Sequence, residues 1–179
     1  MADVDERSDA RRTLIARLAL VTSVALFAAL SVWLLIAGPP EVIGHFSANN
    51  GGPRYDPTAQ FVAIMAGLVA FLVVLFASTG WLMRRVPIGL MNIPNRERWN
   101  TPARREILAR RVGADMNLMG AASVLLIVAM MVLSALGGLG VTPPGWAFVV
   151  TMGVFLVVIA AIAFGMLGKR YDPSTLPPD

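Results

Sequence analysis

The distribution of charge along the chain most limits what it can fold into. All but one of its 15 lysine and arginine residues lie in three groups, and the segments between these groups are long and nearly free of charge. A charged side chain at the centre of a bilayer costs at least about 2.5–3.5 kcal/mol. Apolar segments of this length therefore predict membrane-spanning helices. The groups are Arg7, Arg11, Arg12 and Arg17; then Arg84, Arg85, Arg96, Arg98, Arg104, Arg105, Arg110 and Arg111; and then Lys169 and Arg170, with Arg54 apart.

Four apolar runs have the length that a crossing requires. About 20 apolar residues span a hydrocarbon core, and 56% of the chain is hydrophobic while only 15% is charged. We expect an all-α, integral membrane four-helix bundle that forms a single domain over residues 1–171, followed by a disordered tail at 172–179. The predicted spans are residues 14–37, 59–83, 115–136 and 146–167.

The basic groups also predict the orientation of the spans. Cytoplasmic loops carry an excess of lysine and arginine, so we expect both termini and the loop between the second and third spans to be cytoplasmic in a cell membrane. This explanation leaves no reason to expect a nucleic-acid partner. The chain has no cysteine, which excludes thiolate metal sites. We find no acid–base pair or nucleophile constellation, and expect no enzymatic activity, metal or cofactor.

The loop between the second and third spans contains signals for a helix. Thr101 is a suitable N-cap, and Pro102 occupies the first helical position. Apolar and arginine side chains then share the following turns, which predicts a short amphipathic helix lying against anionic lipid headgroups or docking a cytoplasmic partner. The alternative is a helix that continues into the third span, with Gly113 as a weak joint.

The loop between the first and second spans is the most polar segment on the outer side. Its turn-forming glycines and prolines predict a compact structure over the mouth of the bundle. His45 could form a proton-sensitive pair with Glu41 or Asp56, because histidine titrates near neutral pH. The alternative is a structural turn in which His45 caps a backbone carbonyl.

Both loops resemble the signature segments of one bacterial membrane family, related to the immunity protein of the sporulation-delaying toxin (SdpI-like). The outer loop supplies Val42, Ile43, His45, Phe46, a glycine at 51 or 52, and Tyr55, while the inner loop supplies Asn92, Pro94, Asn95, Trp99, Pro102, Arg104, Arg105 and Glu106. The resemblance implies a four-helix unit in a bacterial plasma membrane with an immunity or signalling role. The alternative is an accessory subunit of a larger membrane complex.

Two candidate sites follow from these segments. The outer-loop ligand site comprises Glu41, His45, Phe46, Arg54, Tyr55 and Asp56. The cytoplasmic site, for a lipid or a regulatory partner, comprises Asn92, Pro94, Asn95, Trp99, Arg104, Arg105, Arg110 and Arg111.

Asp115 and Asn117 open the third predicted span as interfacial polar residues. We expect Asp115 to form an interfacial salt link, with Arg110 and Arg111 as nearby cations. A buried aspartate in a proton or ion relay is the alternative.

Overall fold

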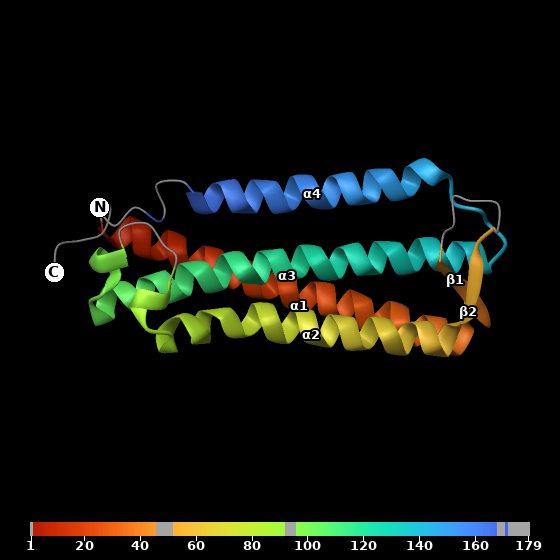
Figure 1. Ribbon diagram of the computed structural model, residues 1–179, viewed down its shortest axis with the longest axis horizontal. Coiled ribbons are helices and arrows are strands. Elements are labelled where there is room, and N and C mark those ends of the chain that lie inside the picture. Colours follow the sequence, from red (N-terminus) through yellow and green to blue (C-terminus); the bar gives the residue numbers. More distant parts are fainter. Residues whose placement is uncertain (1, 46–51, 92–95, 168–170, 172–179) are drawn as a thin grey trace.

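The computed structural model describes residues 2–45, 52–91, 96–167 and 171, and it consists mainly of four long helices (Figure 1). Helices α1 and α3 run in one direction, and α2 and α4 run in the other. We call the end that holds the start of α1 the Arg-rich end and the opposite end the hairpin end. The elements are α1 (Ala2–Ala37), β1 (Glu41–His45), β2 (Arg54–Pro57), α2 (Thr58–Arg85), the 3-10 helices η1 (Ile88–Leu90) and η2 (Arg96–Trp99), α3 (Pro102–Gly138) and α4 (Gly145–Leu167).

All four long helices are long and apolar enough to cross a membrane. The side chains that they expose are also apolar along their middle turns, a surface that water does not tolerate over such an area. These properties support a multi-pass membrane protein. Examples that are more than half exposed are Val21, Ile64, Val74, Val157 and Phe164.

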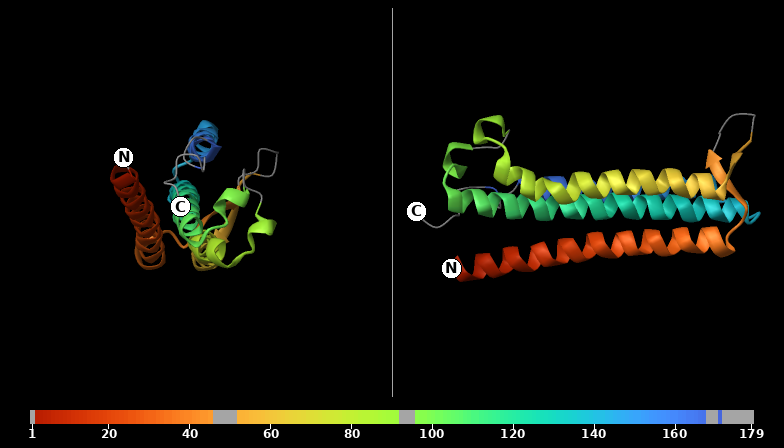
Figure 2. Two further views of the ribbon diagram at one scale, coloured as in Figure 1. Left: turned by 90° about the vertical axis from the view of Figure 1, so that its left-hand side faces the viewer. Right: turned by 90° about the horizontal axis from the view of Figure 1, so that it is seen from below.

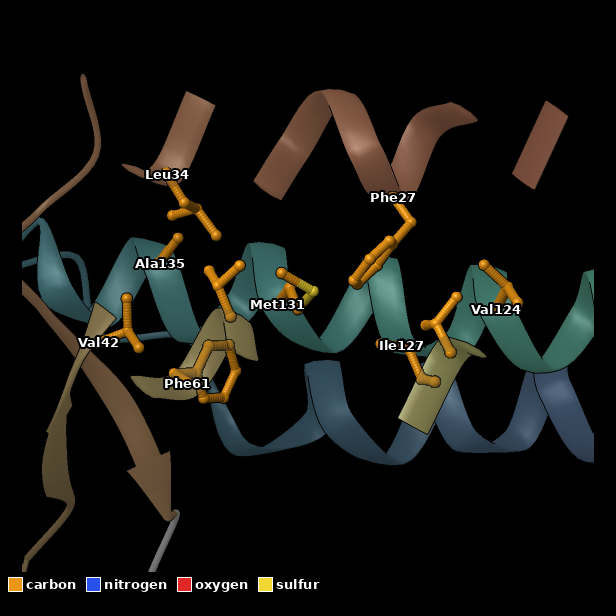
Figure 3. Close-up of a cluster of buried hydrophobic side chains, with 10 residues drawn as sticks. Phe27, Leu34, Val42, Phe61, Val124, Ile127, Met131 and Ala135 are labelled. Atoms are coloured by element: carbon orange, nitrogen blue, oxygen red, sulfur yellow. The ribbon is translucent and has the colours of Figure 1, made fainter. Parts of the chain in front are cut away.

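Helices α1 and α2 both pack on α3, and their apolar side chains meet in one core. Phe27 and Leu34 enter this core from α1, and Phe61 enters from α2 (Figure 3). Helix α4 lies to one side of the three (Figure 2) and packs chiefly against α3. None of residues 145–166 is buried. The predicted four-helix bundle is thus a packed group of three helices with a peripheral fourth, because a helix that is apolar on all sides is stable against lipid.

The prediction of a separate short amphipathic helix is wrong, and the alternative is correct. Residues Pro102–Gly138 form one unbroken helix, which the Thr101 side chain caps as predicted by accepting a hydrogen bond from the Arg104 N–H. Gly113 does not act as a joint. It lies at the contact with α2, where a Cβ atom on Gly113 would be 3.1 Å from the Cα atom of Gly80. The glycine therefore serves helix packing rather than bending.

The loop between α1 and α2 contains an antiparallel β-hairpin, which adds a strand pair to the predicted all-α fold. Val42 pairs with Asp56 and Ile43 pairs with Tyr55, and the register shifts by one residue at Gly44. The Asp56 carboxylate occupies the space that a side chain at Gly44 would need. Both Val42 and Ile43 are buried, and Ile43 lies against Gly137 near the end of α3. The hairpin therefore rests on α3, as a compact structure at this end.

Candidate functional site

Two ion pairs join α1 to α3 at the Arg-rich end, and each helix supplies the acid of one pair and the arginine of the other. The Nε atom of Arg111 lies 2.7 Å from Oδ2 of Asp9, and a guanidinium nitrogen of Arg12 lies 2.9 Å from Oδ1 of Asp115. The acid is on α1 in the first pair and on α3 in the second. Because the two helices run in parallel, a step of three residues along α1 matches a step of four along α3. The pairs therefore fix both the spacing and the register of the helices.

Asp115 is the most deeply buried acidic group of this cluster, with no exposed surface. Its second carboxylate oxygen accepts a hydrogen bond of 2.6 Å from the hydroxyl of Tyr171. The Asp115 carboxylate of α3 thus binds both Arg12 of α1 and a residue beyond the end of α4. A buried carboxylate needs such partners, since leaving it without them is strongly destabilising. Asp115 forms a salt link, but the carboxylate is fully buried and its partner across the helix contact is Arg12 of α1, which the sequence did not indicate.

A third ion pair joins α2 to α3 closer to the water. The guanidinium of Arg84 donates two hydrogen bonds, of 2.7 and 2.8 Å, to the carboxylate of Glu106. About half of each side chain is exposed, 44% for Arg84 and 52% for Glu106. Exposed pairs contribute only about 0–1 kcal/mol, so this pair orients the end of α2 more than it stabilises the fold. The pairs between α1 and α3 carry the greater structural consequence, since Asp9–Arg111 is buried and the carboxylate of Arg12–Asp115 is fully buried.

Trp99, a member of the predicted cytoplasmic site, lies in a small core. Its side chain is only 1% exposed and packs with Met91 and Leu108. Such burial does not fit a contact surface for a partner, and it gives Trp99 a structural role. Asn92, Pro94 and Asn95, from the same predicted site, lie outside the described residues.

The arginines of the predicted cytoplasmic site separate into two groups. Arg105 donates hydrogen bonds to the carbonyls of Met83 and Val86, and Arg104 donates one of 3.2 Å to the carbonyl of Arg98. Arg104 and Arg105, like the buried Arg111, therefore hold the inner loop and the helices in place. The remaining arginine of the site, Arg110, lines a cavity of about 480 Å³ between α1, α2 and α3. Asn117, which was predicted separately as an interfacial polar residue, lines the same cavity.

The predicted outer-loop site lies on the exposed side of the hairpin. Glu41, His45, Arg54 and Tyr55 are exposed. Arg54 forms an ion pair of 3.0 Å with Asp56 and also lies opposite His45 in the strand register. Within residues 41–45 and 54–57, the ion pair thus joins Asp56 to Arg54 rather than to His45, and Phe46 falls outside the described residues.

The residues that the sequence reasoning missed are those that complete ion pairs between distant segments. Arg12 enters the sequence-based prediction only as part of the topology signal, Asp9 has no predicted role, and Tyr171 is placed only at the end of the membrane domain. The available signal was the matching charge spacing, an acid followed by an arginine three residues later on α1 and an arginine followed by an acid four residues later on α3. Such spacings place both charges on one helix face.

No protein-family model, curated protein or solved structure matches this chain. The family resemblance of the two loops stays a prediction. The geometry of the chain itself must carry any proposal about its role.

Proposed function

We propose that this chain is a non-enzymatic membrane protein that transmits a change at the hairpin end to the Arg-rich end through α1 and α3. The observation that carries the proposal is the continuity of α3. This single helix, Pro102–Gly138, holds the hairpin through Gly137 at one end and carries Arg111 and Asp115 at the other.

Helix α1 supplies the second connection between the two ends. It presents Asp9 and Arg12 to α3 and then leads through Pro39 and Pro40 into β1. The first turn of α2 is tied to the same corner, because the hydroxyl of Thr58 donates a hydrogen bond to the Pro39 carbonyl. A ligand that displaces the hairpin would therefore pull on α1 and α3 together. Two discrete arrangements of the ion pairs would supply the bistable element that such transmission needs.

The exposed side chains of the hairpin are the proposed ligand-binding surface, and the Arg-rich end is the proposed site of response. In this scheme the hairpin lies outside a bacterial plasma membrane and both termini are cytoplasmic, as the positive-inside rule favours. An immunity or signalling role of the SdpI-like kind is compatible with such an arrangement. The family assignment rests on the loop segments alone.

Cysteine labelling tests the orientation, because the natural chain has no cysteine. Single substitutions at the exposed positions Ser8, Ala103, Tyr55 and Val141 place a thiol at each end. A membrane-impermeant maleimide should label Y55C and V141C in intact cells, and S8C and A103C only after permeabilisation. Labelling of S8C or A103C in intact cells would contradict the proposed orientation.

Distances between spin labels at S8C on α1 and A103C near the start of α3 test the transmission, because both labels lie at the Arg-rich end. Ile43→Ala removes the side chain that rests on Gly137 and should shift or broaden the distance distribution at the opposite end. The matched control is Ile36→Ala, which deletes the same atoms from a side chain that is 80% exposed at the same end. An identical distribution in both variants and the parent would exclude transmission through this route.

The accessory-subunit alternative is favoured by one observation, the large exposed apolar side of α4. No residue from 145 to 166 is buried, and Phe164, Val157 and Val149 are each at least 70% exposed. The exposed apolar side of α4 would offer a contact surface to another subunit of a larger membrane complex. Gentle purification from the native membrane should then recover a stoichiometric membrane partner, and Val157→Trp should reduce that recovery.

A further inference from the structure

We propose that the cavity at the Arg-rich end binds the phosphate-bearing headgroup of an anionic phospholipid. The cavity has a volume of about 480 Å³ and lies between α1, α2 and α3. This site is separate from the hairpin surface and does not depend on the transmission proposed above. Its chemistry comes from Arg17 on α1 and Arg110 on α3.

The shape of the cavity follows from the residues at its base. Gly80 and Gly113 approach closely where α2 meets α3, and a Cβ atom on Gly113 would lie 3.1 Å from Gly80. Both glycines line the cavity, as do Ala77 and Ala109. Because these side chains are small, the space above the helix contact stays open, and the long arginine side chains stand around it.

Two of the lining arginines form no ion pair with a described residue, although Arg110 lies one helix turn from Glu106 and interacts with its charge. Arg84, which also lines the cavity, is paired with Glu106. Within the part of the chain that the structure describes, Arg17 and Arg110 make no ion pair. The Nε atom of Arg110 is buried without a hydrogen-bond partner, and so is the side-chain oxygen of Asn117. The lining of the cavity therefore carries two more positive charges than negative charges, and two of its buried polar atoms have no hydrogen-bond partner among the described residues.

The depth of the cavity matches that of lipid phosphates. From Asn117 to Gly137, α3 rises about 30 Å, which is the thickness of a hydrocarbon core. Asn117 is therefore at the edge of this core, and most of the cavity, towards Glu106, lies in the headgroup layer. The backbone of Arg17, five residues past Arg12 on α1, is about one turn deeper, and its long side chain reaches back towards that layer. A cation at this edge is stabilised by an anion from the lipid. The guanidinium group offers paired N–H donors that suit phosphate oxygens.

The lining also includes apolar residues that are suited to contact the acyl chains of a lipid. Leu14 and Trp81 border the cavity and are 58% and 55% exposed, so the cavity opens beside apolar surface. A phospholipid can place its phosphate between the arginines while its acyl chains stay in the bilayer. A free phosphate ion would gain only the first of these contacts.

Native mass spectrometry of the full chain in nonionic detergent tests the assignment. Phosphatidylglycerol and phosphatidylcholine with identical acyl chains are added at equal mole fraction, and bound copies are counted. We expect tighter binding of phosphatidylglycerol, with a loss of about fivefold for each arginine removed in R17Q/R110Q. R17K/R110K should retain most of the preference, because both charges remain.

The matched control is R11Q/R98Q, which removes two exposed arginines from the same end without touching the cavity. An equal loss in this control would show attraction to the general surface charge and would overturn the site. Displacement of the lipid by 10 mM inorganic phosphate would overturn the assignment to a lipid. If R17Q/R110Q does not fold, Ala77→Phe fills the cavity and leaves the charges in place. Undiminished preference for phosphatidylglycerol in a folded A77F protein would also contradict the proposal.

Discussion

Asp115 connects three parts of the chain through one carboxylate. It has no exposed surface, and its oxygens contact Arg12 of α1 and the hydroxyl of Tyr171. Removal of one member of a buried ion pair leaves the other charge uncompensated, which costs more than the intact pair contributes. The stability of the Arg-rich end therefore depends on Asp115 more than on any exposed ion pair of this end.

Asp115→Asn should destabilise the protein by about 1–3 kcal/mol, because the buried position loses its ion pair while Arg12, which is 41% exposed, stays partly solvated. The midpoint of thermal unfolding in detergent measures this effect. Asp56→Asn is the matched control, since it breaks the exposed pair with Arg54 and should cost only about 0–1 kcal/mol. A smaller loss in D115N than in D56N would show that the buried pair does not hold α1 on α3.

Trp99 provides a second prediction for a single residue. Its burial against Met91 and Leu108 predicts that Trp99→Ala costs about 3–5 kcal/mol by leaving a cavity. Trp146 is 66% exposed on α4, so Trp146→Ala should change the same unfolding midpoint little. Equal stability of W99A and W146A would contradict the structural role of Trp99 and favour a role in binding a partner.

The sequence predicts residues of this kind only when the partner is close in the chain. Thr101 was identified as an N-cap because its partner, the N–H of Arg104, is three residues away. The partner of Asp115 is about 100 residues away, and nothing in the local pattern selects Arg12 over Arg110 or Arg111. Only the parallel direction of α1 and α3, a property of the assembled helices, brings Arg12 to Asp115.

Among the elements, the hairpin and the end of α3 depend on each other. Gly137 and Gly138 allow β1 to approach α3 closely, and a Cβ atom on Gly138 would lie 2.2 Å from the backbone oxygen of Glu41. These two glycines directly follow the predicted span 115–136 and provide the surface on which β1 rests. The sequence predicts a compact structure for this loop but not the strand pair, because the two strands are short and their register depends on the contact with α3.

Gly138→Ala should loosen the hairpin, since the strand must shift to accommodate the new methyl group. We expect a loss of about 1–3 kcal/mol, typical of overpacking, together with faster hydrogen exchange of the amides in β1. Gly153→Ala in α4 is the control, because a Cβ atom there meets nothing within 4 Å. Equal unfolding midpoints for the two variants would indicate that β1 does not rest on Gly138.

The long helices were predictable from sequence for a physical reason. Absence of charge over about 20 residues has few explanations other than a bilayer, and each of the four predicted spans lies within one of the four long helices. The separation of an amphipathic helix from the third span failed because the polar turns at 102–114 continue the same backbone hydrogen bonds as the apolar turns. The side chains change from polar to apolar along this helix, but the backbone geometry stays the same.

For the whole molecule, the central claim is that the hairpin end and the Arg-rich end are coupled through α1 and α3. Coupling between two sites is reciprocal by thermodynamic necessity. If the hairpin acts on the ion pairs, then a change in the ion pairs must act on the hairpin. The reciprocal effect can be measured without knowledge of the ligand.

Hydrogen exchange of the hairpin amides at 41–45 and 54–57, with the amides of α4 as internal reference, tests this claim most directly. Asp115→Asn breaks one of the two ion pairs between α1 and α3 and should accelerate exchange in the hairpin relative to α4. Glu106→Gln, which breaks the exposed pair with Arg84 at the same end, should leave the hairpin unchanged. Hairpin exchange in D115N that rises no more than that of α4 would contradict the coupling.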